Sequence, residues 1–186
     1  MQAFLVSAAV VAVAEFGDKT QLLALMLAAR FRRPLPILLG IASAALANHV
    51  LAGAVGAGIA AYLGPALLKV LLGGSFIAMG LWALRPQRAA VERRVDPRLG
   101  VFGATLVAYF LAEMGDKTQI ATIALAAHYR TLVPVVAGST AGMVAIDALA
   151  VLLGRAAAER LPRPLIRGVA AAGFVAFGAV ILLGAA

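Results

Sequence analysis

Long apolar segments, separated by short breaks that contain arginine or proline, are the main pattern of this chain. Each apolar segment has about the length of a bilayer-spanning helix, which needs roughly 20 residues. Proline and arginine clusters mark the places where such helices end and leave a membrane. The pattern therefore predicts an all-α integral membrane protein with six transmembrane helices, at residues 3–29, 35–63, 65–84, 99–127, 132–154 and 165–186.

The composition agrees with a membrane protein and excludes several other classes. Hydrophobic residues make up 63% of the 186 residues and charged residues only 13%, whereas soluble domains average about half and about a quarter. So little polar surface excludes a soluble enzyme and a disordered chain. The sequence has no cysteine, which excludes a disulfide scaffold and thiolate metal sites.

The basic residues predict how the spans are oriented. Of the 16 lysines and arginines, 12 occur in the first, third and fifth connections, while the second and fourth carry only Lys69 and Arg130. Because cytoplasmic loops of membrane proteins are rich in basic residues, the odd connections are predicted to be cytoplasmic and both termini outside. The net charge of +8 then reflects topology and contact with anionic lipid, so no nucleic-acid partner is predicted.

A motif of seven residues occurs twice and divides the chain into halves. Glu-Phe-Gly-Asp-Lys-Thr-Gln at 15–21 returns 98 residues later as Glu-Met-Gly-Asp-Lys-Thr-Gln at 113–119. Three spans per half is an odd number, so the second half must cross the membrane in the opposite sense, as in many secondary transporters. The predicted units are a first three-helix repeat (1–90), a basic cytoplasmic linker (91–98) and an inverted second repeat (99–186).

Each motif lies near the middle of its span. Gly17 and Gly115 lower the helix propensity there, and the polar cluster around them predicts a bent or interrupted helix. Irregular backbone at that depth is tolerated only inside protein or along a cavity. The motifs are therefore predicted to face the interior. Glycines in the other spans (Gly53, Gly56, Gly73, Gly74, Gly80, Gly173 and Gly178) are predicted to allow close helix packing.

The motif acids are the candidate cation ligands. A single carboxylate buried in lipid costs several kcal/mol, so four acids at this depth need compensation. In a continuous helix, Lys19 and Lys117 would each lie four residues after a glutamate, which suits an ion pair inside the motif. The acids and lysines sum to a charge of −2, which one divalent cation or two protons would balance. This balance predicts metal/proton exchange.

The donor types favour a hard cation. Carboxylate, amide and hydroxyl oxygens suit Ca²⁺, Mn²⁺ or Mg²⁺, and neither motif contains the cysteine or histidine that Zn²⁺ or Cu⁺ prefers. The predicted metal ligands are Glu15, Asp18, Glu113, Asp116, Gln21 and Gln119. Residues predicted to support the site or couple protons are Lys19, Thr20, Lys117, Thr118, Asp147 and Asn48, with a structural counter-charge role favoured for the lysines.

Two residues of that supporting set lie outside the motifs. Asp147 is 98 residues after His49, the neighbour of Asn48. Asp147 is a candidate helper ligand or proton relay, and a hydrogen bond to a neighbouring helix is the alternative. For His49 and Asn48 such a hydrogen bond is the favoured interpretation.

The doubled E-x-G-D-K-T-Q pattern resembles the transmembrane protein 165-like family, whose hallmark is two copies of E-x-G-D-[KR]-[TS]. The family includes Golgi manganese/calcium transporters, chloroplast relatives and bacterial manganese exporters. The resemblance implies divalent cation (Mn²⁺ or Ca²⁺)/proton exchange by the four motif acids. The compact chain resembles a prokaryotic inner-membrane member of this family. The resemblance to a bacterial exporter implies export of Mn²⁺ from the cytoplasm, with Ca²⁺ as the second candidate cargo.

Three further functions are compatible with the sequence. Asp18 and Asp116 together would suit an intramembrane aspartyl protease, although such an enzyme does not need the repeated glutamates and lysines. A structural membrane subunit or a cation channel would also carry buried charged motifs. The favoured prediction is a transporter that is not an enzyme, has no catalytic residues and no cofactor, and whose partners are divalent metal ions, protons and the bilayer. The sequence does not indicate an oligomeric state.

Overall fold

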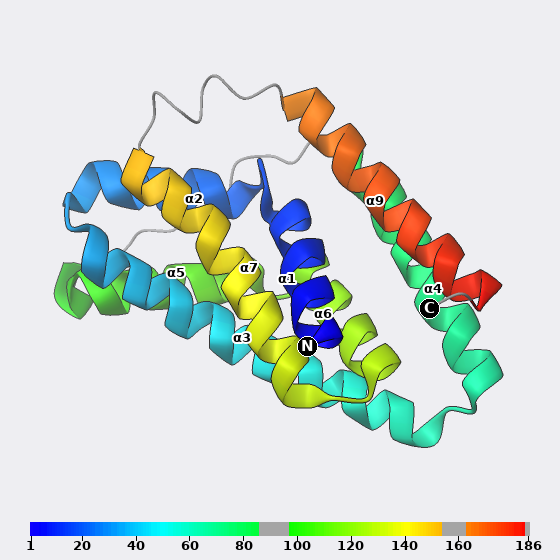
Figure 1. The fold of residues 1–186 in the computed structure, drawn as a ribbon. Coiled ribbons are helices and arrows are strands. Elements are labelled where there is room, and N and C mark those ends of the chain that lie inside the picture. Colours follow the sequence, from blue (N-terminus) through cyan, green and yellow to red (C-terminus); the bar gives the residue numbers. More distant parts are fainter. Residues whose placement is uncertain (86–96, 154–162, 185–186) are drawn as a thin grey trace.

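The computed structural model describes residues 1–85, 97–153 and 163–184. This part is helical, in agreement with the predicted all-α class. Its elements are α1 (Gln2–Glu15), α2 (Lys19–Phe31), α3 (Pro34–Tyr62), α4 (Pro65–Ala83), the short 3-10 helix η1 (Pro97–Leu99), α5 (Gly100–Glu113), α6 (Lys117–Tyr129), α7 (Leu132–Leu153) and α9 (Arg163–Leu183) (Figure 1). Most of the predicted linker at 91–98 lies outside the described residues.

The local sequence explains where several helices begin and end. Proline occupies the first turn of α3 and of α4, where its missing N–H leaves no hydrogen bond unmade. Arg32 and Arg130 end α2 and α6 in the left-handed conformation, with φ of 52° and 51°. The backbone N–H of each donates to the carbonyl four residues earlier and so closes the last turn.

The predicted spans correspond to these helices with one systematic difference. The first and fourth spans each contain two helices, because the chain breaks at the motif and turns sharply between α1 and α2 (Figure 1). The predicted interruption is thus confirmed. Among the described residues, three helices are long and apolar enough to cross a membrane: Pro34–Tyr62, Pro65–Ala83 and Leu132–Leu152. Gln2–Glu15, Gly100–Glu113 and Gly168–Leu183 are apolar but shorter.

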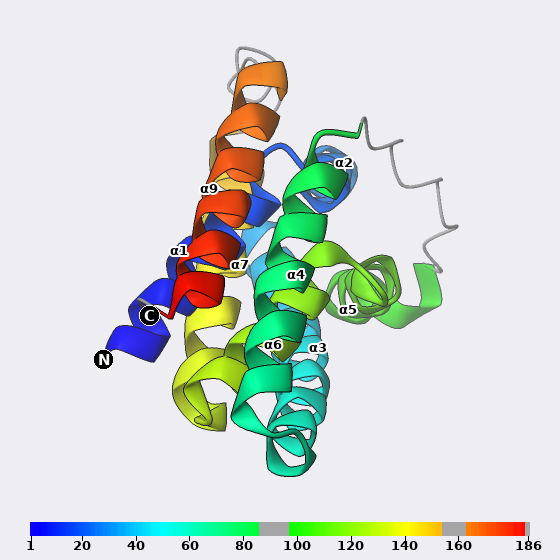
Figure 2. The same cartoon turned by 90° about the vertical axis from the view of Figure 1, so that its right-hand side faces the viewer.

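The two halves of the chain interlock. Helix α4 packs along α9, α1 along α7, and α3 against α5, α6 and α7 (Figures 1 and 2). In each of these pairs, one helix comes from the first half and the other from the second. The halves therefore do not form two separate bundles, and the core lies between them.

Positions 98 residues apart make matching contacts in this core. A methyl group added at Gly40 would lie 2.9 Å from the carbonyl oxygen of Phe102, and one at Gly138 would meet that of Phe4. Likewise, a methyl group at Gly80 would lie 2.9 Å from the oxygen of Ala171, and one at Gly178 would lie 2.6 Å from that of Gly73.

Of the glycines predicted to allow close packing, five do lie against a neighbouring helix: Gly53, Gly56, Gly73, Gly80 and Gly178. The prediction is wrong for Gly74 and Gly173. A methyl group added at either position would have nothing within 4 Å, so neither glycine is needed for a helix to approach closely.

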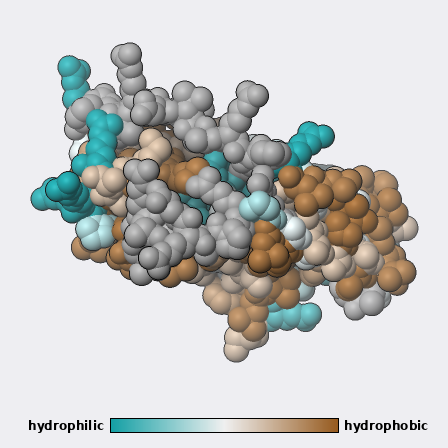
Figure 3. All heavy atoms as spheres, turned by 90° about the horizontal axis from the view of Figure 1, so that it is seen from above, coloured by the Kyte–Doolittle hydropathy of each residue, from teal (hydrophilic) through white to brown (hydrophobic). Residues whose placement is uncertain are grey.

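The outside of the molecule is apolar over much of its area. Hydrophobic residues cover the end of the molecule that contains α4 and α9, whereas polar groups gather at the opposite end (Figure 3). Leu67, Val70, Leu81 and Val169 are each more than half exposed. Exposed leucine and valine in such numbers match a surface that faces lipid rather than water.

Candidate metal-binding site

The two motifs form the same interruption in their helices. Helix α1 ends at Glu15, Gly17 has a φ of 75°, and Asp18 immediately precedes α2. In the second half, Glu113, Gly115 with a φ of 75° and Asp116 occupy the same places. Glycine adopts a positive φ without the steric cost that other residues bear.

Each turn is stabilised by the glutamine that ends the motif. The backbone N–H of Gly17 donates to Gln21 Oε1 at 3.0 Å, and that of Gly115 donates to Gln119 Oε1 at 2.9 Å. These oxygens therefore already have a donor in this structure. A role for the two glutamines as metal ligands stays a prediction.

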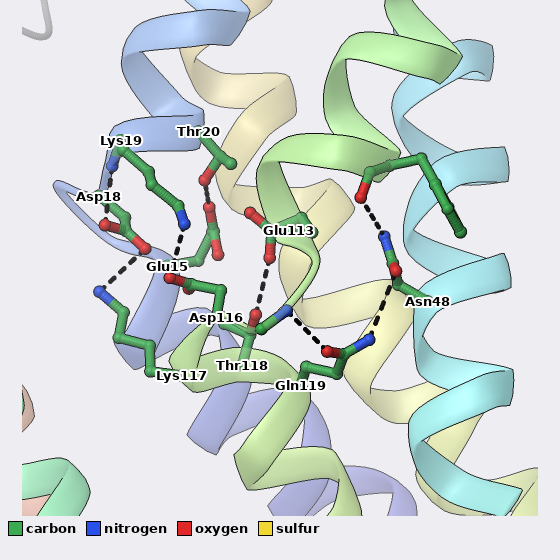
Figure 4. Close-up of polar contacts among 12 residues, drawn as sticks. Glu15, Asp18, Lys19, Thr20, Asn48, Glu113, Asp116, Lys117, Thr118 and Gln119 are labelled. Atoms are coloured by element: carbon green, nitrogen blue, oxygen red, sulfur yellow. Dashed lines mark hydrogen bonds and ion pairs between the residues drawn. The ribbon is translucent and has the colours of Figure 1, made fainter. Parts of the chain in front are cut away.

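The structure brings the four motif carboxylates together in the interior. Glu15, Asp18, Glu113 and Asp116 are all buried, each at most 3% exposed. The carboxylate of Glu15 lies within electrostatic range of those of the other three. Two helix breaks from opposite halves of the chain thus form one acidic cluster (Figure 4).

The lysines cross between the motifs. Lys19 Nζ lies 2.8 Å from Asp116 Oδ1, and Lys117 Nζ lies 2.9 Å from Asp18 Oδ2 (Figure 4). The prediction of ion pairs inside each motif is therefore wrong. It assumed a continuous helix, in which residues four apart share a face, whereas α1 ends at Glu15 before Lys19 is reached.

The glutamates have hydroxyl partners instead. Thr20 Oγ1 donates to Glu15 Oε1, and Thr118 Oγ1 donates to Glu113 Oε2 at 2.8 Å. In the part of the chain that the structure describes, the second oxygen of each glutamate has no hydrogen-bond partner. These two oxygens can accept a proton or contact a cation.

Asp147 adds a fifth carboxylate to the cluster. It comes from α7, is completely buried, and lies within electrostatic range of Glu113 and Asp18. Neither of its oxygens has a hydrogen-bond partner among the described residues. A hydrogen bond to a neighbouring helix was the alternative for Asp147, and Tyr109 of α5 lies beside its carboxylate. A role as helper ligand or proton relay stays a prediction.

Tyr109 on α5 is a neighbour of Asp147 that the sequence did not single out. Its hydroxyl donates to the carbonyl oxygen of Thr20 at 2.7 Å and so joins the second half to the first motif. The repeat offered no signal, because the residue 98 positions earlier is Val11. The one signal in the sequence was a tyrosine within an apolar segment, because a buried tyrosine hydroxyl needs a hydrogen-bond partner.

Asn48 and His49 lie on the other side of the site, on α3. Asn48 donates to the carbonyl oxygen of Phe110 at 3.2 Å and accepts from Gln119 Nε2 at 3.4 Å. His49 Nδ1 lies 3.1 Å from Thr140 Oγ1. These contacts agree with the favoured interpretation of both residues as helix-to-helix hydrogen-bonding groups.

In this structure the aspartates of the cluster are paired with the lysines of the motifs rather than arranged around a metal ion. Within the described ranges, no three histidine, aspartate or glutamate side chains converge in an arrangement that would hold a metal ion. Both aspartates are paired with an ammonium group instead. The donor set nevertheless consists of oxygen ligands, which suit a hard divalent cation as cargo.

Comparison with known proteins identifies a family for the chain. The model of the family described as "Divalent cation/proton antiporter GDT1" matches residues 3–90 and 101–186. The chain is 45% identical to a Vibrio cholerae protein named "Putative manganese exporter", over 94% of this chain and 88% of that protein. It is 28% identical to the "GDT1-like protein sll0615" of Synechocystis, over 97% and 96%.

Similarity extends to plant proteins. No solved structure matches the chain. The "GDT1-like protein 3" of Arabidopsis thaliana is 35% identical over 50% of this chain and 30% of that protein. These similarities support the predicted transporter over a protease, a channel or a structural subunit, and they agree with a metal ion that is cargo rather than cofactor. The chain belongs to the GDT1 family of divalent cation/proton antiporters and is a membrane transporter, not an enzyme.

Proposed function

We propose that this protein exports Mn²⁺ from the cytoplasm in exchange for protons, with Ca²⁺ as a second cargo. The observation that carries the proposal is the buried cluster in which two helix breaks meet, with Glu15, Asp18, Glu113 and Asp116 in one place. The name of the Vibrio cholerae relative supports Mn²⁺ as the first cargo and export as the direction.

The four motif carboxylates bind the cation in this proposal. Their oxygens supply the hard ligands that Mn²⁺ and Ca²⁺ prefer. The unpartnered oxygens of Glu15 and Glu113 are free to take part, and Asp147 lies beside them. Charged groups at this depth are costly when unbalanced, so protons replace the metal when it leaves. One set of carboxylates then serves both ions.

The arrangement in the membrane is part of the same proposal. The chain crosses the inner membrane six times as two inverted repeats, with both termini outside and the basic connections in the cytoplasm. The interrupted helices α1–α2 and α5–α6 each count as one span. The arginines at the end of α2 and the start of α3, Arg30, Arg32 and Arg33, support the cytoplasmic placement of the first connection.

Proton movement in proteoliposomes tests the exchange. Purified protein is reconstituted with an internal pH dye, and Mn²⁺, Ca²⁺, Mg²⁺ or Zn²⁺ is added outside. We expect Mn²⁺, and more weakly Ca²⁺, to raise the internal pH, because each entering cation drives protons out. Asp18→Asn and Glu113→Gln should abolish the signal while the protein still folds.

Asp96→Asn is the matched control, since it makes the same change in the predicted linker, and it should exchange like the unmodified protein. Full exchange by both Asp18→Asn and Glu113→Gln would contradict the site. No pH change with any of the four ions, from folded protein, would contradict the antiport itself.

A further inference from the structure

In the two ion pairs of the site, each lysine pairs with the aspartate of the other motif. Lys19 of the first motif pairs with Asp116 of the second, and Lys117 of the second pairs with Asp18 of the first, at 2.8 and 2.9 Å. The aspartate side chains are at most 4% exposed. Each pair is neutral by itself, so both aspartates are compensated without a metal ion.

The glutamates and Asp147 differ from the aspartates in this respect. Among the ion pairs between described residues, none involves Glu15, Glu113 or Asp147. The direct ion pairs thus join the lysines to the aspartates, which precede the second half-helix of each span.

An ammonium group and a metal ion compete for the same space at a carboxylate. Lysine carries three donors and no acceptor, so its Nζ lies directly against the oxygens. A bound divalent cation lies about 2.0–2.6 Å from such oxygens. The ammonium 2.8 Å from Asp116 Oδ1 therefore competes with a cation for this carboxylate.

We infer that Lys19 and Lys117 are tethered cations that hold the aspartates of the empty transporter and are displaced by the cargo ion. The inference rests on the proposed function and names the step at which cargo binding begins. Two ammonium groups carry the same charge as one divalent ion, so the exchange leaves the charge around the aspartates unchanged. Each pair also joins the two halves of the chain, so cargo binding removes two links between them.

The inference predicts that loss of a lysine strengthens cation binding. In Lys19→Gln and Lys117→Gln, one aspartate has no competing cation, and the dissociation constant for Mn²⁺ should fall by about tenfold. The maximum exchange rate should fall as well, because the empty site then lacks its own counter-charge on the return step. A lower KM together with a lower kcat separates competition from simple damage.

Titration calorimetry with Mn²⁺ on the purified full-length protein in detergent measures the dissociation constant. Lys69→Gln is the matched control, because Lys69 is on α4 and lies beside Gly184 rather than at the motifs. Its dissociation constant should equal that of the unmodified protein. Lys19→Arg keeps a tethered positive charge at Asp116, so its dissociation constant should not fall as that of Lys19→Gln does.

Two choices of variant separate weaker binding from loss of folding. Lys19 is more exposed than Lys117, 22% against 8%, so Lys19→Gln is the milder change. If Lys117→Gln does not fold, Lys117→Gln with Asp18→Asn removes both charges of the pair and should restore folded protein that binds more weakly than Lys19→Gln.

A folded Lys19→Gln that binds Mn²⁺ no more tightly than the unmodified protein would overturn the inference, even where that protein exchanges Mn²⁺ for protons. If the unmodified protein neither binds nor exchanges any of the four cations, the proposed function fails and the inference fails with it.

Discussion

At the residue scale, the buried carboxylates differ in what balances them. The aspartates have lysines, the glutamates have threonine hydroxyls, and Asp147 has no hydrogen-bond partner among the described residues. A buried carboxyl group without a partner reduces stability. Proteins keep such costs chiefly where function requires them. Asp147 is therefore the residue whose stability and activity effects should diverge most clearly.

Asp147→Asn should leave the melting temperature unchanged or higher, because it removes an uncompensated acid from the interior. Mn²⁺/proton exchange should fall at least about tenfold, a rise of roughly 1.4 kcal/mol in the effective barrier. Thermal denaturation in detergent and the proteoliposome assay measure the two quantities. Thr140→Val, on the same helix, removes the contact with His49 and should retain exchange. Full exchange by Asp147→Asn would show that this acid takes no part in transport.

At the element scale, the interrupted helices follow from the motif itself. A glycine at positive φ ends one half-helix, and an aspartate begins the next. Both copies of the motif produce the same turn, with the same glutamine hydrogen bond. Because the helix is interrupted there, backbone groups and acid side chains of the motifs can approach one another in the interior. A continuous helix would have kept them apart.

Gly115→Ala should lower the free energy of unfolding by about 1–2 kcal/mol, the cost of a left-handed conformation for a residue with a side chain. Space is not the cause, because nothing lies within 4 Å of the added methyl group. Gly58→Ala is the matched control: it also faces open space, but inside α3, and should stabilise by about 0.5–1 kcal/mol. Chemical or thermal denaturation measures both. Equal effects of the two changes would argue against a strained turn.

At the scale of the whole molecule, the two halves of the chain are proposed to cross the bilayer in opposite directions. Arg33 precedes α3, and Thr131, 98 residues later, precedes α7. Both residues are exposed. In an inverted repeat, such equivalent positions lie on opposite sides of the membrane. In a parallel repeat they would lie on the same side.

The absence of cysteine from the sequence makes this prediction simple to measure. In intact cells, a membrane-impermeant thiol reagent should label Thr131→Cys but not Arg33→Cys, which should react only after permeabilisation. Gly64→Cys, exposed after α3, should be labelled from outside like Thr131→Cys. Labelling of Arg33→Cys and Thr131→Cys from the same side would contradict the inverted topology.

The sequence alone determined the properties that depend on neighbouring residues. Hydropathy and the absence of polar surface gave the all-α class, and Gly17 and Gly115 gave the helix breaks. The repeated motif identified the four acids, because buried carboxylates in two matching copies have few explanations besides a shared site. These features are local, so a one-dimensional pattern is sufficient to predict them.

Only the tertiary structure decided which groups meet. The lysines pair across the halves, Tyr109 reaches Thr20, and Asp147 joins the glutamates. Each of these contacts depends on helices far apart in sequence packing side by side. The error over the lysine partners has the same origin: spacing along one helix predicts a neighbour only while the helix continues. The helix break changed the direction of the chain and so assigned each lysine to the aspartate of the other half.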